Sequence, residues 1–381
     1  METATYEAIV VGAGPGGLAT LATLLDAGVR NILWVDRTFG GGRLNGLYRE
    51  ISSNTKIGIY LDAIYASPHC RSIIESSSAP NAITQLESMD RESTCQLSLA
   101  GDMICMLRDR LLQFPKVEKK VSKVEQMFLD DGIWTVLMAG AKVKAKRVFL
   151  CTGSHPKSAS LHHPINPDLI VLDVDECMRR SKLPSLLPED SKSVVGVVGN
   201  SHSGILCCWN LYEISKSNKR DLKVFNFCRR PITYAKYTND GIVFDNSGLK
   251  GKTAEWAKNV MEKNLDHTRL EEIDLSKDED SVYREYLPKC THIVYAIGYE
   301  RSSLPKIYVN GQRKEMEVEF DMYSSGFHFR DGGGRAFGLY GNGIAFPQLV
   351  TDPEGHIEKA VGVAKFFSFA ERVKENWLHV R

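Results

Sequence analysis

Short apolar runs recur along the chain at positions typical of buried parallel strands. Each ends at a glycine, a small residue or an acid, and they cover residues 8–11, 32–35, 147–150 and 194–198. Continuous apolar runs of this length are typical of strands that helices cover on both faces. Apolar residues at helical spacing predict helices after the first run and over residues 99–112, 205–214 and about 357–376. Alternating strands and helices indicate the α/β class.

Weaker patterns connect these elements. A hairpin is predicted over residues 121–136, and a further strand over 222–227. The run 291–295 predicts a strand that we expect to pair with the strand ending at Cys151, returning the chain to the first unit. Prolines at 156, 164 and 167 break regular structure, so a linker is expected at about 155–170.

A glycine-rich turn, Gly12-Ala13-Gly14-Pro15-Gly16-Gly17, follows the first strand directly and opens a helix. In such a loop the first glycine makes the tight turn, the second lets backbone approach a pyrophosphate, and the third allows close helix–strand packing. Free N–H groups at the helix N-terminus then favour the phosphates. The next strand ends in Asp36, whose carboxylate can accept hydrogen bonds from a ribose. This unit predicts a bound FAD or NAD.

The same order of parts returns at Gly199-Asn200-Ser201-His202-Ser203-Gly204, where Ser201 replaces the second glycine. The following strand ends not in an acid but in Arg229 and Arg230. Arginine is a planar, permanently charged fork suited to phosphate, so this pair indicates the 2′-phosphate of NADP. Two nucleotide loops in one chain suggest electron transfer between two cofactors.

Two other glycine clusters leave alternatives open. Residues 39–44 place glycines beside Arg43, which either approaches a flavin or its phosphates or lies in an ordinary loop. Residues 337–343 precede the final predicted helix, and either supply backbone N–H groups to a flavin or form a plain turn.

Composition fits a compact enzyme. The 381 residues are 43% apolar and 25% charged, with a net charge of +1, so no bulk attraction to nucleic acid or membrane is implied. No apolar stretch is long enough to cross a bilayer, and the first strand begins close to Met1, so we expect no signal peptide and a cytoplasmic protein.

Cysteine and histidine usage points away from disulfide and metal chemistry. The nine cysteines include no C-x-x-C pair, and we expect reduced, mostly buried thiols, which argues against a disulfide reductase. His162 and His163 lie in the proline-bounded linker and are expected at the surface rather than on a metal; no metal site is predicted.

The order of these parts resembles the two-dinucleotide-binding-domain flavoproteins, and among them the class B flavin monooxygenases, which include flavin-containing monooxygenases and lysine or ornithine N-hydroxylases. Ser53-Asn54-Thr55-Lys56 is similar to their Ser-Asn-(Ser/Thr)-Lys element, and Ala296-Ile297-Gly298-Tyr299 to their Ala-Thr-Gly-Tyr. Their F-x-G-x-x-x-H fingerprint is absent, and residues 171–175 stand in about its place.

The resemblance implies an α/β fold of two Rossmann-like domains, with the NADP domain inserted into the FAD domain: 1–160 and 290–381 for FAD, 161–289 for NADP. It implies that NADPH reduces FAD, and that a flavin hydroperoxide passes one oxygen atom from molecular oxygen to a nitrogen, sulfur or ketone of a small molecule. Asn54 is the predicted catalytic residue beside the flavin. The predicted cofactor-binding residues are Gly12, Gly14, Pro15, Gly17, Asp36, Arg37, Arg43, Lys56, Val121, Thr152, Gly153, Gly199, Asn200, Ser201, His202, Ser203, Arg229, Arg230, Gly341 and Asn342.

Two other hypotheses remain at this point. One is an FAD oxidase or dehydrogenase whose substrate reduces the flavin and whose NADP site has degenerated, which Ser201 and the missing fingerprint favour. The other is a non-catalytic flavoprotein that senses redox state or organises partners. Oligomeric state and substrate identity do not follow from the sequence.

Overall fold

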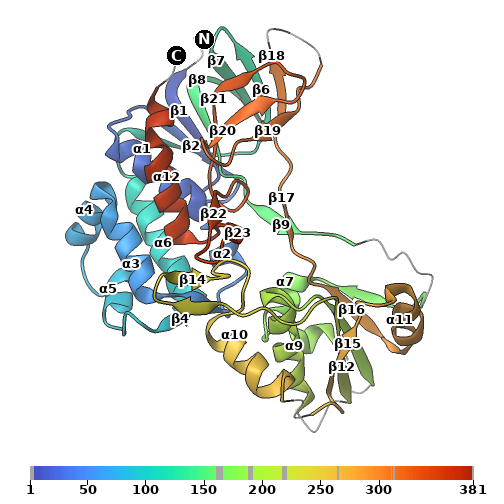
Figure 1. Ribbon diagram of the computed structural model, residues 1–381. Helices are drawn as coiled ribbons and strands as arrows, with labels where there is room; N and C mark the ends of the chain where they lie inside the picture. The colour runs from blue at the N-terminus through green and yellow to red at the C-terminus, as the bar shows by residue number, and fades with distance from the viewer. Residues whose placement is uncertain are drawn as a thin grey trace.

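The computed structural model describes residues 4–159, 166–187, 192–216, 221–263, 266–309, 311 and 314–379. Two lobes, each built on its own sheet, are joined by the paired segments β9 and β17 (Figure 1). These are β9 (Ser154–Pro156) and β17 (Tyr299–Arg301), which run antiparallel to each other. The predicted α/β class with Rossmann-like units is confirmed by this arrangement.

The first lobe contains a ten-stranded sheet whose main path is β18-β6-β7-β8-β1-β2-β5. Its strands are β1 (Thr5–Val11), β2 (Ile32–Asp36), β5 (Val117–Val121), β6 (Val124–Asp130), β7 (Ile133–Met138), β8 (Ala141–Leu150), β18 (Lys306–Val309), β19 (Val318–Phe320), β20 (Gly326–Phe329) and β21 (Arg335–Gly341). Strand β1 pairs in parallel with β2 and β8, so Val35, Val11 and Leu150 end side by side. Loops that follow them therefore leave the sheet at one edge.

Helices and short strands complete the first lobe. They are α1 (Pro15–Asp26), α2 (Gly42–Gly46), β3 (Ser52–Lys56), α3 (Ile57–Ala66), α4 (Pro68–Ser76), α5 (Ala82–Glu87), β4 (Thr94–Gln96), α6 (Leu97–Leu111), β22 (Leu349–Thr351), β23 (Ile357–Lys359) and α12 (Val363–Leu378). The α1 and α12 helices pack against each other and against the sheet (Figure 1). Trp34, Trp134 and Trp377 are fully buried in this core, which places the largest apolar side chains where burial stabilises most.

The second lobe has a five-stranded sheet in the order β10-β16-β11-β12-β15. Its elements are β10 (Ile170–Leu172), α7 (Val174–Cys177), α8 (Leu183–Leu186), β11 (Ser193–Val198), α9 (His202–Ser215), β12 (Leu222–Cys228), β13 (Lys236–Thr238), β14 (Gly241–Val243), α10 (Gly251–Trp256), the π-helical turn Ala257–Met261, β15 (Leu270–Asp274), α11 (Glu279–Tyr286), the 3-10 turn Leu287–Lys289 and β16 (His292–Tyr295). All pairings in this sheet are parallel.

Three expectations are corrected here. The 291–295 strand does not join the Cys151 strand: β16 lies in the second sheet, beside β11, where it holds the place that β8 holds beside β1. The predicted hairpin starts later, at β6, because Val121 ends β5 in parallel pairing with β2. Ile357–Lys359 is strand β23, and the final helix begins only at Val363, after Gly362 with a φ of 149°.

Cysteine and linker expectations can also be compared with the structure. All nine cysteines are free thiols, and all except Cys105 are buried, as expected. His162, His163 and the predicted boundary between residues 160 and 161 fall outside the described residues. No group of three metal-ligating side chains is found among the residues that the structure describes.

Candidate active site

The first glycine loop is held by backbone contacts too close for any side chain. Gly12 has a φ of 111°, and a Cβ there would lie 2.2 Å from the carbonyl oxygen of Cys151. A Cβ on Gly17 would lie 1.8 Å from the Gly12 carbonyl, which also accepts a hydrogen bond of 2.8 Å from Trp34 Nε1. Only glycine fits at either position, because real Cβ atoms do not approach carbonyl oxygens so closely.

The second loop repeats these close backbone contacts. A Cβ on Gly199, whose φ is 108°, would lie 2.5 Å from the Ala296 carbonyl, and a Cβ on Gly204 would lie 2.1 Å from the Gly199 carbonyl. Asn226 Nδ2 donates to the Gly199 carbonyl at 3.0 Å, as Trp34 does in the first loop. Ser201, the replaced glycine, has φ and ψ of −81° and −176°, against −85° and −171° at Gly14. Serine therefore leaves the backbone of this loop intact.

Three glycine segments distant in sequence converge at the start of α1. A Cβ on Gly14 would lie 3.5 Å from the Cα of Gly42, and a Cβ on Gly16 would lie 2.7 Å from the Cα of Gly343. Pro15 is the first residue of α1, where its missing N–H costs no hydrogen bond. The loop, the 40–42 cluster and the C-terminal glycine cluster together form a backbone-lined cradle at a helix N-terminus, a geometry suited to phosphates.

Asp36 closes the edge of this cradle. One carboxylate oxygen accepts from Ala13 N at 2.8 Å, and the other from Thr38 N and Phe39 N at 2.8 and 2.7 Å. Asp36 and Thr152 line a pocket of about 740 Å³, with Gly12 and Arg37. Val121 lies directly across from Asp36 in the sheet and is 58% exposed.

Thr152 has an unsatisfied hydroxyl in this region. Its Oγ1 is buried without a hydrogen-bond partner among the described residues. The neighbouring Gly153 has a φ of 76°, and a Cβ placed on it would have no atom within 4 Å. A buried hydroxyl beside a pocket is a natural partner for a ligand oxygen or nitrogen.

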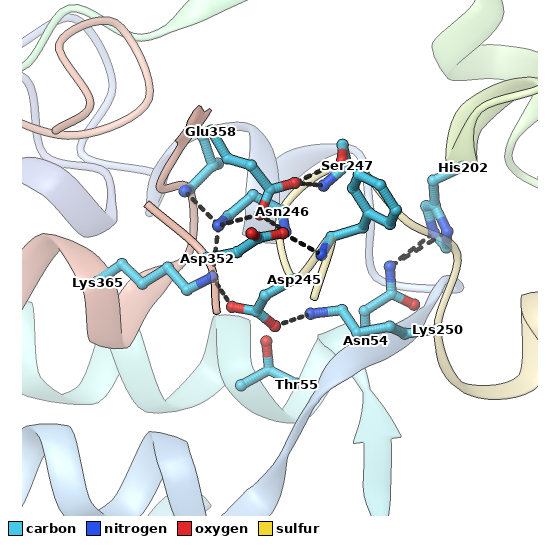
Figure 2. Close-up of polar contacts among 12 residues, drawn as sticks. Asn54, Thr55, His202, Asp245, Asn246, Ser247, Lys250, Asp352, Glu358 and Lys365 are labelled. Atoms are coloured by element: carbon cyan, nitrogen blue, oxygen red, sulfur yellow. Dashed lines mark hydrogen bonds and ion pairs between the residues drawn. The ribbon is translucent and has the colours of Figure 1, made fainter. Parts of the chain in front are cut away.

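A larger pocket, of about 840 Å³, lies between the two lobes. It brings together the second loop from Gly199 to Ser203, Asn54 from β3, and the start of α12. Asn54 Nδ2 is 3.1 Å from Nδ1 and 3.4 Å from Nε2 of His202, at the first position of α9 (Figure 2). Two predicted site residues, 148 positions apart in the chain, therefore meet at the lobe junction.

His202 is held neutral in this position. Burial, and then the positive charge of Lys250, lower the pKa of His202 from 6.5 to about 4. At neutral pH the imidazole therefore has one lone pair, to which the Asn54 amide can donate. The contact is a neutral hydrogen bond, and the amide oxygen of Asn54 stays available to a ligand.

Ion pairs and hydrogen bonds hold the segment around Asp245 against the first lobe (Figure 2). Lys250 Nζ lies 2.7 Å from Asp245, and Lys365 of α12 also pairs with that carboxylate. Burial disfavours the carboxylate form of Asp245, but the two lysines outweigh this and keep its pKa below the ordinary value. Glu358 of β23, 7% exposed, accepts from the backbone N of Asn246 and Ser247 at 3.1 and 2.9 Å.

Some of the predicted cofactor-binding residues make their contacts with other residues of the protein. The Arg43 guanidinium forms an ion pair with Asp175 of the second lobe. The Asn342 side chain is fully buried and donates to Thr20 Oγ1 and to the Phe366 carbonyl, so it fastens α1 to α12. Gly341 is likewise part of β21, where a Cβ would lie 2.5 Å from the Phe346 ring. The C-terminal segment can therefore offer a cofactor its backbone rather than its side chains.

The basic side chains around the larger pocket differ in whether they already form ion pairs within the protein. Arg229 forms a bidentate pair with Glu279, at 2.8 and 2.7 Å. Arg230 is exposed and makes no ion pair within the described ranges, while its carbonyl accepts from Asn200 Nδ2. Lys56 Nζ lies 2.6 Å from Glu92 at the pocket rim. Arg230 is therefore the basic group of the pair that is free to bind an anion.

Residues outside the predicted set also build this site. Asp175, Asp245, Glu358 and Lys365 make contacts between the lobes, Lys250 supports Asp245 from the same segment, and no local motif marks any of them. The one signal available was position, since Asp175 lies in the segment that replaces the missing fingerprint. The contacts of Asp175, Asp245 and Glu358 with Arg43, Lys365 and Ser247 join residues more than a hundred positions apart, whereas Lys250 and Asp245 are five positions apart.

Comparison with known proteins yields a relative that matches over nearly the whole chain. No family model matches the chain. It is 37% identical over 389 residues to the monooxygenase AgnR1 of Paecilomyces divaricatus, with 97% of each chain covered. No helix in the described part of the chain has the length and apolar character needed to span a membrane.

Solved structures share the architecture at low identity. The L-lysine 6-monooxygenase of Pseudomonas syringae matches with a TM-score of 0.62 and 11% identity, covering 98% of this chain and 99% of that one. FAD-bound OTEMO matches with a TM-score of 0.60 and 11% identity, covering 98% of both chains. At such identities the likeness establishes the fold.

Proposed function

The chain belongs to the same family as the monooxygenase AgnR1 and has the fold of the class B flavin monooxygenases, and from this premise we propose that it is an FAD-dependent monooxygenase that uses NADPH. In this proposal one oxygen atom of O₂ is inserted into a small organic substrate at nitrogen, sulfur or a ketone. We further propose the predicted division into an FAD domain and an inserted NADP domain, with the second boundary moved from residue 289 to beyond Tyr295, because β16 lies in the sheet of the second lobe.

The observation that carries the proposal is the pair of glycine loops with matching close contacts. The Gly17 and Gly204 positions each pack on the carbonyl of the first glycine of their loop. The second loop opens directly into the pocket that contains Asn54 and His202. Two nucleotide-binding loops of equal geometry support two dinucleotides, and a degenerate second site would not require these contacts.

FAD fits the first loop. The converging glycines leave room for a pyrophosphate against backbone, Asp36 can accept from the ribose, and the buried Thr152 hydroxyl lacks a partner among the described residues. Val121 offers an exposed apolar surface next to Asp36 for an adenine ring. Flavin supplies the hydride acceptance and oxygen activation, while the chain supplies binding, orientation and exclusion of water.

The pocket surface indicates the kind of substrate. Four of the exposed large apolar side chains of the molecule line the larger pocket: Ile59, Tyr237, Ile297 and Val361. Apolar side chains exposed inside a concave site are typical of ligand pockets, with a few polar groups that fix orientation. Asn54 and neutral His202 are such polar groups, so we propose a largely apolar substrate that meets the Asn54 amide at the lobe junction.

Anaerobic mixing with reduced nucleotides tests the proposed function. We expect the purified protein to contain FAD, NADPH to bleach the flavin absorbance rapidly, and NADH to do so more slowly. Readmission of oxygen should then produce the absorbance of a flavin hydroperoxide before the oxidised flavin returns. Bleaching by neither nucleotide would contradict the proposal and favour an oxidase or dehydrogenase that its own substrate reduces.

Arg230 should determine the preference for NADPH over NADH. An Arg230→Ala variant removes a guanidinium that forms no ion pair with any residue the structure describes, and we expect about a tenfold or greater weakening of NADPH binding, because a hydrogen-bonded charge pair contributes about 1.5–3 kcal/mol. NADH binding should change little. The matched control is Arg284→Ala, an exposed arginine on α11 outside the pocket. Equal weakening of both nucleotides would show that Arg230 does not contact the 2′-phosphate.

A further inference from the structure

Asp175 is a buried carboxylate at the junction of the lobes that the proposed chemistry does not use. It lies on α7, only 4% of the residue is exposed, and three side chains converge on it. The hydroxyls of Tyr48 and Tyr299 donate to Oδ1 at 3.0 and 2.9 Å, and Arg43 forms an ion pair with Oδ2. Arg43 Nε also donates to the Tyr48 hydroxyl at 3.2 Å, so the network is closed.

Two of the partners of Asp175 lie next to the two glycine loops. Arg43 directly follows Gly42, whose Cα lies in contact range of the Gly14 position in the first loop. On the other side, Tyr299 follows Ala296, whose carbonyl lies 2.5 Å from a Cβ placed on Gly199, and Tyr299 lines the larger pocket together with Ser203 of the second loop. One carboxylate thus connects Arg43, next to the predicted FAD loop, with Tyr299, next to the predicted NADP loop.

Asp175 lies in a segment that departs from the motif pattern of the similar proteins. Asp175 is the last residue of the segment 171–175, which stands where the F-x-G-x-x-x-H fingerprint of similar proteins is missing. The neighbouring Asp173 has a different role, since its Oδ1 accepts from the backbone N of Asp175 and Glu176 and so caps α7. The capped helix fixes the direction of Asp175 toward the first lobe.

Burial makes this network a constraint on how the lobes sit against each other. A carboxylate removed from water needs its partners, because an uncompensated buried charge is strongly destabilising. Sliding or rotating one lobe against the other would separate Asp175 from Arg43, so the pair favours one relative position of the two loops. Hydride transfer needs its reacting atoms about 3–3.5 Å apart, and a misplacement of about 1 Å can slow a reaction about a hundredfold.

We infer that Asp175 is a positioning residue. It keeps the two dinucleotide-binding loops at the relative position that hydride transfer from NADPH to FAD requires. The assignment rests on the proposed function, since it concerns transfer between the two proposed cofactors. Asp175 acts through Arg43, Tyr48 and Tyr299, and it does not itself contact the reacting atoms. The negative charge of the Asp175 carboxylate is essential to this role, because a neutral amide at this position could not form the ion pair with Arg43.

The kinetic test uses Asp175→Asn, which keeps the size of the side chain and an oxygen that accepts from the tyrosine hydroxyls but removes the charge. We expect the rate of flavin reduction at saturating NADPH to fall about tenfold or more, with FAD content and NADPH affinity within about threefold of the wild-type values. The matched control is Glu176→Gln, which removes a carboxylate from the same helix that pairs only locally with Arg179. The control should reduce its flavin at the wild-type rate.

A second readout does not require turnover. In the apoprotein, Asp175→Asn should speed amide hydrogen exchange in residues 42–48 and 199–206 together, while exchange in β1 stays unchanged. Glu176→Gln should change neither segment. A double variant with Arg43→Gln should exchange and react like Asp175→Asn alone, because both changes break the same pair.

These outcomes separate the inference from the proposed function. If NADPH fails to reduce the wild-type flavin, the proposed function fails, and hydrogen exchange still decides whether Asp175 couples the loops. Wild-type reduction kinetics in Asp175→Asn, or faster exchange throughout the molecule, would overturn the positioning role. Should Asp175→Asn not fold, Tyr48→Phe removes one donor without stranding a charge. Its reduction rate should then fall by a smaller factor, and an unchanged rate would count against the network.

Discussion

A Gly17→Ala variant should lose FAD almost completely. The added Cβ would lie 1.8 Å from the Gly12 carbonyl oxygen and 3.5 Å from Trp34 Nε1, which holds that carbonyl. Both neighbours are fixed, one by the backbone and the other by full burial, so the loop itself has to move. Overpacking of this kind costs about 1–3 kcal/mol or more, and it displaces the N–H groups expected to bind the pyrophosphate.

Two further glycine variants make this result specific. Gly46→Ala adds a Cβ with no atom within 4 Å, so its FAD content and melting temperature should match those of the wild type. Gly204→Ala makes the equivalent clash in the second loop, 2.1 Å from the Gly199 carbonyl, and should keep FAD while losing NADPH binding. Flavin absorbance of the purified proteins and nucleotide titration measure these outcomes. Full FAD occupancy in Gly17→Ala would show that this loop is not the FAD site.

An Asn54→Ala variant should separate NADPH consumption from product formation. The Asn54 amide is paired with neutral His202 at the pocket that both lobes line, and its oxygen can still orient a ligand. Removing one positioned hydrogen-bonding group from an active site lowers turnover by about a hundredfold to a thousandfold. We expect a loss of oxygenated product of at least about tenfold, with hydrogen peroxide released instead, because an oxygen intermediate without its hydrogen bond decays before it reacts.

The control measurements for Asn54 separate flavin reduction from the later transfer of oxygen to the substrate. Flavin reduction by NADPH should stay within about threefold of the wild-type rate, because the side chain acts after reduction in the proposed sequence. Asn54→Asp keeps the acceptor and loses the amide donor, so its behaviour shows which half of the amide matters. Asn259→Ala, an exposed asparagine next to Lys263, serves as a surface control. Unchanged product yield per NADPH in Asn54→Ala would remove Asn54 from the site.

Local sequence was sufficient to locate the two glycine loops. Gly12, Gly17, Gly199 and Gly204 are recognisable because their backbone conformation and close contacts admit only glycine, and this requirement is written into a few adjacent residues. The sequence pattern alone suggests that Ser201 disturbs the second loop, because it replaces a glycine. Its backbone is extended like that of Gly14, and an extended residue tolerates a side chain wherever space allows.

Sequence-based predictions were less accurate where the structure depends on pairing between distant segments. The apolar run that became β16 fits any central parallel strand, and only the register with β11 places it in the second sheet. Arg43 looked available beside its glycines, yet Asp175, more than a hundred residues away, holds its guanidinium. Helical spacing extended the last helix too far back, because the positive φ of Gly362 separates it from β23.

Short stretches of sequence were enough to establish the α/β class, the two glycine loops, the acid at the end of β2 and the arginines at the end of β12. Backbone sterics and charge act within a few neighbouring residues, so these features can be recognised locally. Three features required the folded chain: Asn54 meets His202, Arg230 rather than Arg229 is free of an ion pair within the described residues, and Asp175 links the loops. Burial and ion pairing depend on which distant segments fold against each other, and no local pattern encodes those neighbours.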